Sequence, residues 1–301
     1  MNNGNNAKLK VFPITLGTMT YGNPVAFDEA VELTRYALSK GIDLIDTANM
    51  YEGYDRTPGS AGGTAERIIG KAIAGMDRGR VQIATKLGMK VGTEAVDAGT
   101  SAAAIHTQLS RSLERLDTEY VDIYYLHCFD EQTPYEEMLE ALTEELEKGR
   151  IRSYGVSNYS AEQLSGLLRT ADRLGLPRPV VCQPPLSLLK QDALTELLPL
   201  CQREGIAVIP YQIYQGGLLT GKYRRNAAAP AGSRGQEMPG WLMARDDAVF
   251  DRLEAVGAAA EERGMTMAHY ALRWVLEQPA VVSAIIGVKN REQIDSAIAA
   301  L

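Results

Sequence analysis

Eight short apolar runs, each followed by an amphipathic segment, constrain the fold of this chain more than any other feature. The expected strands are residues 13–18, 42–46, 81–86, 121–127, 151–157, 179–183, 206–211 and 281–286. The expected helices are residues 28–40, 64–75, 101–116, 134–148, 160–172, 190–204, 246–263 with 266–277, and 290–300. Strands that alternate with helices indicate a parallel sheet, because each helix returns the chain to the edge where the next strand starts.

Two of the strand segments, "VDIYYLH" and "IAVIPY", are apolar on both faces, as a sheet covered on both sides requires. Eight β/α units over residues 11–301 predict a single-domain (β/α)₈ TIM barrel. A doubly wound open sheet is the alternative, but it favours a glycine fingerprint after the first strand, and "ITLGTMTYG" has no G-x-G-x-x-G. We expect a flexible tail over residues 1–10 and a long irregular loop over residues 212–245.

Two helix starts are marked by capping residues. "TPYE" predicts Thr133 as the N-cap residue with Pro134 as the first helical residue. "SAEQ" predicts a capping box between Ser160 and Gln163.

The charge balance and the apolar pattern exclude several classes of protein. Lys and Arg number 31 and Asp and Glu 38, and the resulting net charge of −7 argues against a nucleic-acid partner. The sequence contains no run of 18 apolar residues, so no membrane span is predicted. The polar start "MNNGNNAKLK" does not resemble a signal peptide. The three cysteines lack metal-ligand spacing, so we expect reduced thiols, no metal, and a cytoplasmic location.

Polar residues end three consecutive strands. The second expected strand ends on Asp46, the third on Lys86 and the fourth on His127. Neighbouring strands lie about 4.8 Å apart, so these side chains can converge at the carboxyl end of a barrel, together with Tyr51. Each residue alone fits a structural role, such as a turn cap, a snorkelling lysine or a core histidine. All four together indicate a catalytic site.

The chemistry of the four side chains predicts a proton donor. A free phenol has a pKa of about 10, and an adjacent ammonium group lowers it. Asp46 pairs with Lys86 and orients it, Tyr51 donates a proton to a carbonyl oxygen, and His127 hydrogen-bonds to the same oxygen. The remaining strand ends are also polar: Ser157 and Asn158, Gln183 and Tyr211.

The sequence resembles the aldo-keto reductase superfamily in the stretches "DTANMYEG", "IATK", "YYLH", "GVSN", "GGLLTGKY" and "GVKNREQI". The resemblance runs from about residue 11 to residue 301. It implies an NADPH-dependent oxidoreductase that reduces aldehydes or ketones on a (β/α)₈ barrel. It also implies a catalytic tetrad of Asp46, Tyr51, Lys86 and His127.

The resemblance further implies a cofactor site. Ser157, Asn158 and Gln183 would hold the nicotinamide carboxamide, and Tyr211 would stack on the ring. "GGLLTGKY" would lie along the pyrophosphate with Lys222 nearby. The full set is Gly17, Thr18, Ser157, Asn158, Gln183, Tyr211, Gln212, Gly217, Leu218, Lys222, Gly287, Lys289, Asn290 and Gln293. The chain departs from many relatives at Gln212, at Leu186, and at Ser296–Ala297.

The start of the final helix suits a phosphate group. Asn290 is placed as N-cap with Gln293 three residues later, and a helix N-terminus presents free N–H groups. Lys289 and Arg291 add positive charge where the family binds the 2′-phosphate, so we expect NADPH to be preferred over NADH.

The substrate is a small carbonyl compound whose identity the sequence does not give. Candidate pocket residues are Met19, Tyr21, Met50, Phe129, Tyr214 and Trp241, which would make an apolar, aromatic mouth. Two alternatives stay open. The chain could be an NADPH-binding regulatory subunit, as potassium-channel β-subunits are, or Lys86 could form a Schiff base in a lyase. The oligomeric state is not predicted.

Overall fold

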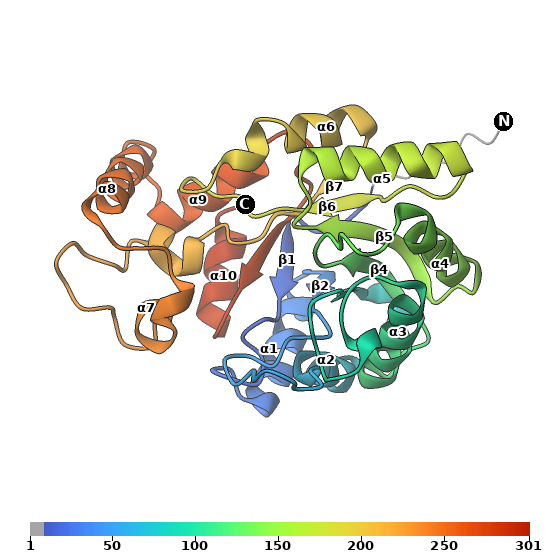
Figure 1. Cartoon of the computed structure of the whole chain (residues 1–301). Helices are drawn as coiled ribbons and strands as arrows, with labels where there is room; N and C mark the ends of the chain where they lie inside the picture. Colours follow the sequence, from blue (N-terminus) through green and yellow to red (C-terminus); the bar gives the residue numbers. More distant parts are fainter. Residues whose placement is uncertain (1–8) are drawn as a thin grey trace.

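The computed structural model describes residues 9–301. The predicted tail, residues 1–10, therefore lies almost entirely outside the described residues. Eight strands are formed: β1 (Ile14–Gly17), β2 (Leu44–Asp46), β3 (Gln82–Leu87), β4 (Val121–Leu126), β5 (Ile151–Ser157), β6 (Val181–Gln183), β7 (Ala207–Val208) and β8 (Ala284–Gly287). Figure 1 shows these strands at the centre of the molecule, surrounded by helices.

The described helices follow the predicted order. They are α1 (Phe27–Ser39), α2 (Thr64–Ile73), α3 (Ala102–Leu116), α4 (Tyr135–Glu147), α5 (Ala161–Leu174), α6 (Leu197–Glu204), α7 (Arg234–Glu237), α8 (Asp247–Glu261), α9 (Met267–Leu276) and α10 (Arg291–Ala299). Short 3₁₀ turns cover Arg78–Arg80, Ala95–Asp97, Asp192–Leu194, Gln215–Thr220 and Pro239–Trp241. Each predicted strand and helix overlaps an observed one, although β7 is much shorter than residues 206–211.

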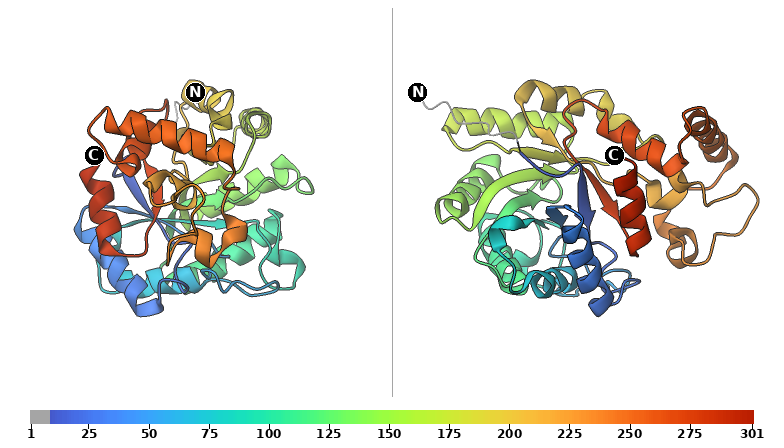
Figure 2. Two further views of the ribbon diagram at one scale, coloured as in Figure 1. Left: turned by 90° about the vertical axis from the view of Figure 1, so that its left-hand side faces the viewer. Right: turned by 180° about the vertical axis from the view of Figure 1, so that it is seen from behind.

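The eight strands form one parallel sheet in the order β7-β6-β5-β4-β3-β2-β1-β8. The two ends of this order meet at an isolated bridge between Val208 and Val281. Backbone hydrogen bonds from Val282 to Val208 and from Ile285 to Pro210 accompany the bridge. The curled sheet is therefore the predicted (β/α)₈ fold, and Figure 2 shows the helices around it from two further directions.

Two apolar layers stabilise this arrangement. One fills the inside of the sheet, with Leu44, Ala84, Ile123, Tyr125, Val181, Ile209 and Ile285. The larger layer lies between the sheet and the helices and contains most of the buried Ile, Leu and Val side chains. Because both faces of the strands are covered, their side chains are apolar in both directions, and polar residues are concentrated at the strand ends.

The cap predicted for α5 is confirmed. Ser160 and Gln163 form the capping box at the start of α5. The prediction for α4 was wrong: Pro134 is the N-cap residue, and it has no side-chain cap bond. The Thr133 hydroxyl instead donates to the Asp130 carboxylate at 2.7 Å, and Thr133 does not cap α4.

The predicted loop over residues 212–245 is irregular but packed. It contains the short helix α7 and two 3₁₀ turns. Leu218, Leu219 and Tyr223 form a small apolar cluster with Phe250 and Leu253 of α8. Figure 1 shows this segment with α7 and α8 on the left, beyond α10.

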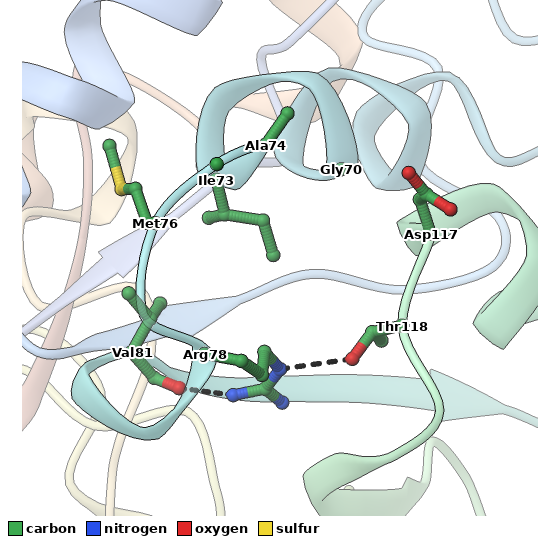
Figure 3. A pocket seen from close by; sticks show the side chains of 9 residues that line it. Gly70, Ile73, Ala74, Met76, Arg78, Val81, Asp117 and Thr118 are labelled. Atoms are coloured by element: carbon green, nitrogen blue, oxygen red, sulfur yellow. Dashed lines mark hydrogen bonds between the residues drawn. The ribbon is translucent and has the colours of Figure 1, made fainter.

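A cavity of about 200 Å³ lies away from the strand carboxyl ends. Figure 3 shows its lining, which comes from the end of α2, the turn after it, the turn after α3, and Val81. Because Val81 precedes β3, the cavity is at the opposite end of the barrel from the strand carboxyl ends. Arg78 occupies one side and donates to Thr118 at 3.1 Å and to the carbonyl of Val81. With its one cation bonded to neighbouring groups, this cavity contains no candidate catalytic constellation.

Among residues 9–301, no helix is long and apolar enough to cross a membrane.

Candidate active site

Lys86 is the centre of the polar cluster at the carboxyl ends of β2, β3 and β4. Its side chain is fully buried, and its ammonium group donates to Asp46 Oδ1 at 2.6 Å and to the carbonyl of Thr47 at 2.8 Å. It also donates to the phenolic oxygen of Tyr51 at 3.3 Å. All three ammonium protons are therefore engaged, and the Tyr51 hydroxyl keeps its own proton available for another acceptor.

The local fold explains why Tyr51 reaches Lys86. Asp46 is the last residue of β2, and the chain then turns back toward β3: the backbone N–H of Asn49 donates to the carbonyl of Lys86 at 3.1 Å. The N–H of Tyr51 donates to the carbonyl of Ala48 at 3.1 Å. These two bonds hold the turn beside the end of β3 and direct the phenol over the ammonium group.

The pKa values of the pair follow from burial and charge together. Burial raises the pKa of Tyr51, and the nearby charge of Lys86 lowers it only in part, so the net direction is upward. The sequence-based expectation of a lowered phenol pKa was therefore wrong in its net sign. Burial lowers the pKa of Lys86, but Asp46 and Tyr51 outweigh this, and the pKa ends above its usual value. At neutral pH the cluster holds a neutral phenol and a charged lysine.

His127 follows β4 and faces Tyr51. The two ring centroids are 5.9 Å apart in an edge-on arrangement. His127 is buried, and its Nδ1 atom has no hydrogen-bond partner among the described residues. Burial, and then the charges of Lys86 and Arg56, hold the pKa of His127 well below its ordinary value. The imidazole is consequently neutral at neutral pH and can still donate one hydrogen bond.

The ends of β5, β6 and the segment after β7 form a second polar group next to the first. Gln183 donates to Asp46 Oδ2 at 2.7 Å and so connects the two groups. Ser157 donates to the carbonyl of Gln183 at 2.9 Å. Asn158 donates to the carbonyl of His127 at 2.8 Å and accepts from the Tyr211 hydroxyl at 2.6 Å. A cavity of about 440 Å³ borders Asn158 on the side of α5 and α6.

The start of α10 lies where the sequence placed it. Strand β8 ends at Gly287, and Asn290 is the N-cap residue, accepting from the N–H of Gln293 at 3.0 Å. The Gln293 side chain accepts from the N–H of Lys289 at 2.8 Å. The Lys289 ammonium pairs with Glu237 of α7 and donates to the carbonyl of Gly232 at 2.8 Å.

Other predicted cofactor residues surround the same mouth. Gly17 ends β1, and the Thr18 hydroxyl donates to the carbonyl of Asp46 at 3.0 Å. In the segment after β7, Gln212 and Gly217 have positive φ values of 61° and 95°, and Leu218 is buried.

Burial lowers the pKa of Lys222 in this same segment. Its ammonium atom is 2.7 Å from where a Cβ on Gly217 would stand, and the φ of 95° at Gly217 favours glycine there.

The predicted pocket residues separate into two groups. Met19, Met50, Phe129 and Tyr214 are partly exposed, and Trp241 is 48% exposed. Tyr21 is a correction: it is completely buried, and its hydroxyl bonds to Thr34 of α1 at 2.9 Å. It belongs to the core between β1 and α1 and does not line the mouth.

Comparisons with known proteins show the family of this chain. The sequence model of the Aldo/keto reductase family matches residues 13–301. The chain belongs to this family.

Similar curated proteins include a probable voltage-gated potassium channel subunit beta of Arabidopsis thaliana. It is 34% identical over 293 residues, covering 95% of this chain and 86% of that protein. An aldo-keto reductase of Bacillus subtilis is 31% identical over 289 residues, covering 94% of this chain and 83% of that protein. Among solved structures, the glycerol dehydrogenase AKR11B4 from Gluconobacter oxydans aligns with a TM-score of 0.79 and 28% identity, over 97% of this chain and 87% of that one.

This aldo-keto reductase has a further cluster at the mouth that the sequence did not indicate. Tyr54 and Trp241 pack edge-on with centroids 5.8 Å apart. The guanidinium of Arg234 lies 5.1 Å from the Tyr54 ring centroid, and the Lys289 ammonium lies 5.8 Å from it. These contacts join three separate loops, and no periodicity or spacing in the sequence predicts a contact between distant loops.

Proposed function

We propose that this aldo-keto reductase reduces aldehydes or ketones to alcohols with NADPH, and that Tyr51 is the proton donor. The direction of one hydrogen bond carries the proposal: Lys86 donates into the phenolic oxygen of Tyr51. Because Lys86 is the donor in this bond, it cannot accept the hydroxyl proton of Tyr51, and that proton is free for a substrate oxygen.

Each residue of the cluster has a part in the proposed reaction. NADPH, when bound, would supply a hydride for the carbonyl carbon. Tyr51 would donate a proton to the carbonyl oxygen, so that the products are an alcohol and NADP⁺. Lys86 stays charged and stabilises the phenolate left on Tyr51, while Asp46 holds Lys86 in place. His127, with a neutral imidazole, can donate to the same carbonyl oxygen and fix its position.

The donor groups around the mouth suit a dinucleotide. Ser157, Asn158 and Gln183 present hydroxyl and amide groups beside Asp46, as a carboxamide needs. The unpartnered Nδ1 atom of His127 and the amino end of α10 offer further polar contacts. Lys289 and Asn290 would hold the 2′-phosphate and Tyr211 would lie against the nicotinamide ring.

A panel of aldehydes, ketones and aryl carbonyls, assayed by NADPH absorbance, tests this function. We expect NADPH consumption to match alcohol formation one to one for at least one class of carbonyl. NADPH that binds without being consumed by any compound of the panel would contradict the proposal.

A regulatory role is the second candidate, and it rests on the relatives named as potassium channel subunits. In such a role, the chain would bind a partner protein in a way that depends on the dinucleotide. A pull-down from cell extract with and without NADPH tests it. Partner capture that changes with NADPH would support a sensor role, and it is compatible with catalysis.

Schiff-base chemistry on Lys86 is not favoured. An amine must be neutral to attack a carbonyl, and Asp46 together with Tyr51 raises the pKa of Lys86 against the effect of burial. Borohydride added with a carbonyl substrate should therefore trap no covalent adduct, which mass spectrometry of the intact protein can check.

A further inference from the structure

Arg56 is a half-buried cation at the rim of the candidate site. It lies in the segment that leaves the carboxyl end of β2, five residues after Tyr51. Its guanidinium group donates a hydrogen bond to the main-chain carbonyl of Lys90, in the loop that follows β3. The side chain therefore spans two neighbouring loops of the barrel mouth.

Arg56 lies close enough to His127 for its charge to act on the imidazole. Burial is the main cause of the low pKa of His127, followed by the charges of Lys86 and Arg56. Lys86 is fully buried below Tyr51, whereas Arg56 is half-buried in a mouth loop. The two loops that Arg56 connects follow the carboxyl ends of β2 and β3, which carry Asp46 and Lys86, so they border the mouth through which a substrate bound at His127 extends.

Within residues 9–301, neither Arg56 nor Lys90 forms an ion pair with a carboxylate. The Arg56 guanidinium donates to the carbonyl of Lys90, and the Lys90 ammonium donates to the carbonyl of Glu94 at 3.2 Å. The acids of the surrounding loops are bound elsewhere: Glu52 to Ser60, Asp55 to Asn23, Glu94 and Asp97 to Arg111, and Asp130 to Thr100 and Thr133. In a chain of net charge −7, a half-buried arginine at the mouth of the site without a carboxylate partner is suited to an anionic ligand.

We propose that Arg56 binds an anionic group of the carbonyl substrate, so that aldehydes or ketones with a carboxylate or phosphate are preferred over neutral ones. This inference rests on the proposed function and adds its substrate class. A guanidinium presents paired N–H donors that match carboxylate and phosphate oxygens, and its position above the site leaves the reacting carbonyl to Tyr51 and His127.

Matched acids and methyl esters test the proposal. Succinic semialdehyde is compared with its methyl ester, and 4-carboxybenzaldehyde with methyl 4-formylbenzoate. Glyceraldehyde 3-phosphate against glyceraldehyde separates phosphate from carboxylate. We expect a KM at least tenfold lower for the anionic member of at least one pair, with kcat little changed, because the anion contact is present before and during the reaction.

Three variants test whether the preference for anionic substrates depends on the charge of Arg56. Arg56→Gln should remove the preference for the anionic member, and Arg56→Lys should retain most of it. Arg67→Gln is the matched control, because Arg67 is an exposed arginine that donates to the carbonyl of Gly62 in the same loop, at 3.3 Å. It should leave the preference unchanged.

Calorimetry measures ligand binding without turnover, so it tests the role of Arg56 separately from the proposed function. Binding of 4-(hydroxymethyl)benzoate to the NADP⁺-loaded protein should weaken at least tenfold in Arg56→Gln, and binding of its methyl ester should not. If neither the acids nor the esters are reduced, the proposed function fails and calorimetry still decides the role of Arg56. Equal KM values for acid and ester in all pairs, or a preference that survives Arg56→Gln, would overturn the inference.

Discussion

Lys86 binds three oxygen atoms at once, and this determines what Tyr51 can do. Because the ammonium group donates to Asp46, to the carbonyl of Thr47 and to Tyr51, it cannot rotate freely or act as a nucleophile. Burial keeps the phenol protonated, and Lys86 makes its loss of a proton less costly than burial alone would.

The first prediction for a single residue concerns Tyr51. Tyr51→Phe removes the phenolic proton and leaves the ring packing intact, so carbonyl reduction should fall by about 10²–10⁴-fold. NADPH affinity, measured by quenching of protein fluorescence, should stay close to that of the unaltered protein. Reduction within a few-fold of the unaltered rate would show that another group donates the proton.

The second prediction concerns Lys86 and pH. The phenol donates only while protonated, so reduction should fall as pH rises through the pKa of Tyr51, which burial raises above its ordinary value. Lys86→Met removes the charge that lowers this pKa, so the falling limb should move to still higher pH, while turnover drops strongly. The check is the pH profile of kcat in both proteins. Identical alkaline limbs would mean that the two groups are not coupled.

Some features of single residues could be predicted from the sequence, and others could not. Asp46, Lys86 and His127 could be predicted because strand ends of a parallel barrel meet at one rim. The burial of Tyr21 could not, since its partner Thr34 lies on a helix whose rotation the sequence does not give. The net pKa of Tyr51 was also missed, because desolvation depends on how tightly the finished site is packed.

Among the structural elements, α10 is the one that we propose to hold the 2′-phosphate of NADPH. Its first turn has a capped N-terminus, and the cation just before it, Lys289, pairs with Glu237 of α7. The start of the helix was predictable from Asn290 and Gln293. The pairing was not, because α7 lies in a long segment without periodicity.

The third prediction tests this element. Lys289→Ala should raise the KM for NADPH and leave the KM for NADH nearly unchanged, because only NADPH has the 2′-phosphate. A charge-assisted contact contributes roughly 1.5–3 kcal/mol, which corresponds to an order of magnitude or more in affinity.

Glu237→Gln is the companion variant, since it removes the partner of Lys289 and keeps the lysine. Calorimetric titration of NADPH should show that this variant binds at least as tightly as the unaltered protein. Equal losses for both dinucleotides in Lys289→Ala would place the 2′-phosphate elsewhere.

At the scale of the whole molecule, the inside of the barrel leaves no free volume near Gly155. A Cβ atom at this position would lie 2.6 Å from the carbonyl oxygen of Val181 and 2.7 Å from the Tyr125 ring. The fold was predictable here from eight β/α units, but this close packing was not, because it depends on which side chains of neighbouring strands share a layer.

The fourth prediction follows from this contact. Gly155→Ala should lower the free energy of unfolding by about 1–3 kcal/mol, as overpacking of a core does. Urea unfolding followed by circular dichroism measures it. Gly240→Ala is the control, because no heavy atom lies within 4 Å of a Cβ there, and its midpoint should stay unchanged. A urea midpoint for Gly155→Ala equal to that of the control would show that the side chains inside the barrel can rearrange around the added methyl group.

The closure between Val208 and Val281 has a consequence for synthesis of the chain. Strand β8 pairs with β1 and completes the ring, yet its residues, 284–287, are translated long after those of β1. Until they emerge, the nascent sheet has two unpaired edges, at β1 and β7. Open strand edges are templates for association with other chains. The growing polypeptide is therefore most exposed to aggregation just before its last strand leaves the ribosome, and the finished ring removes that hazard.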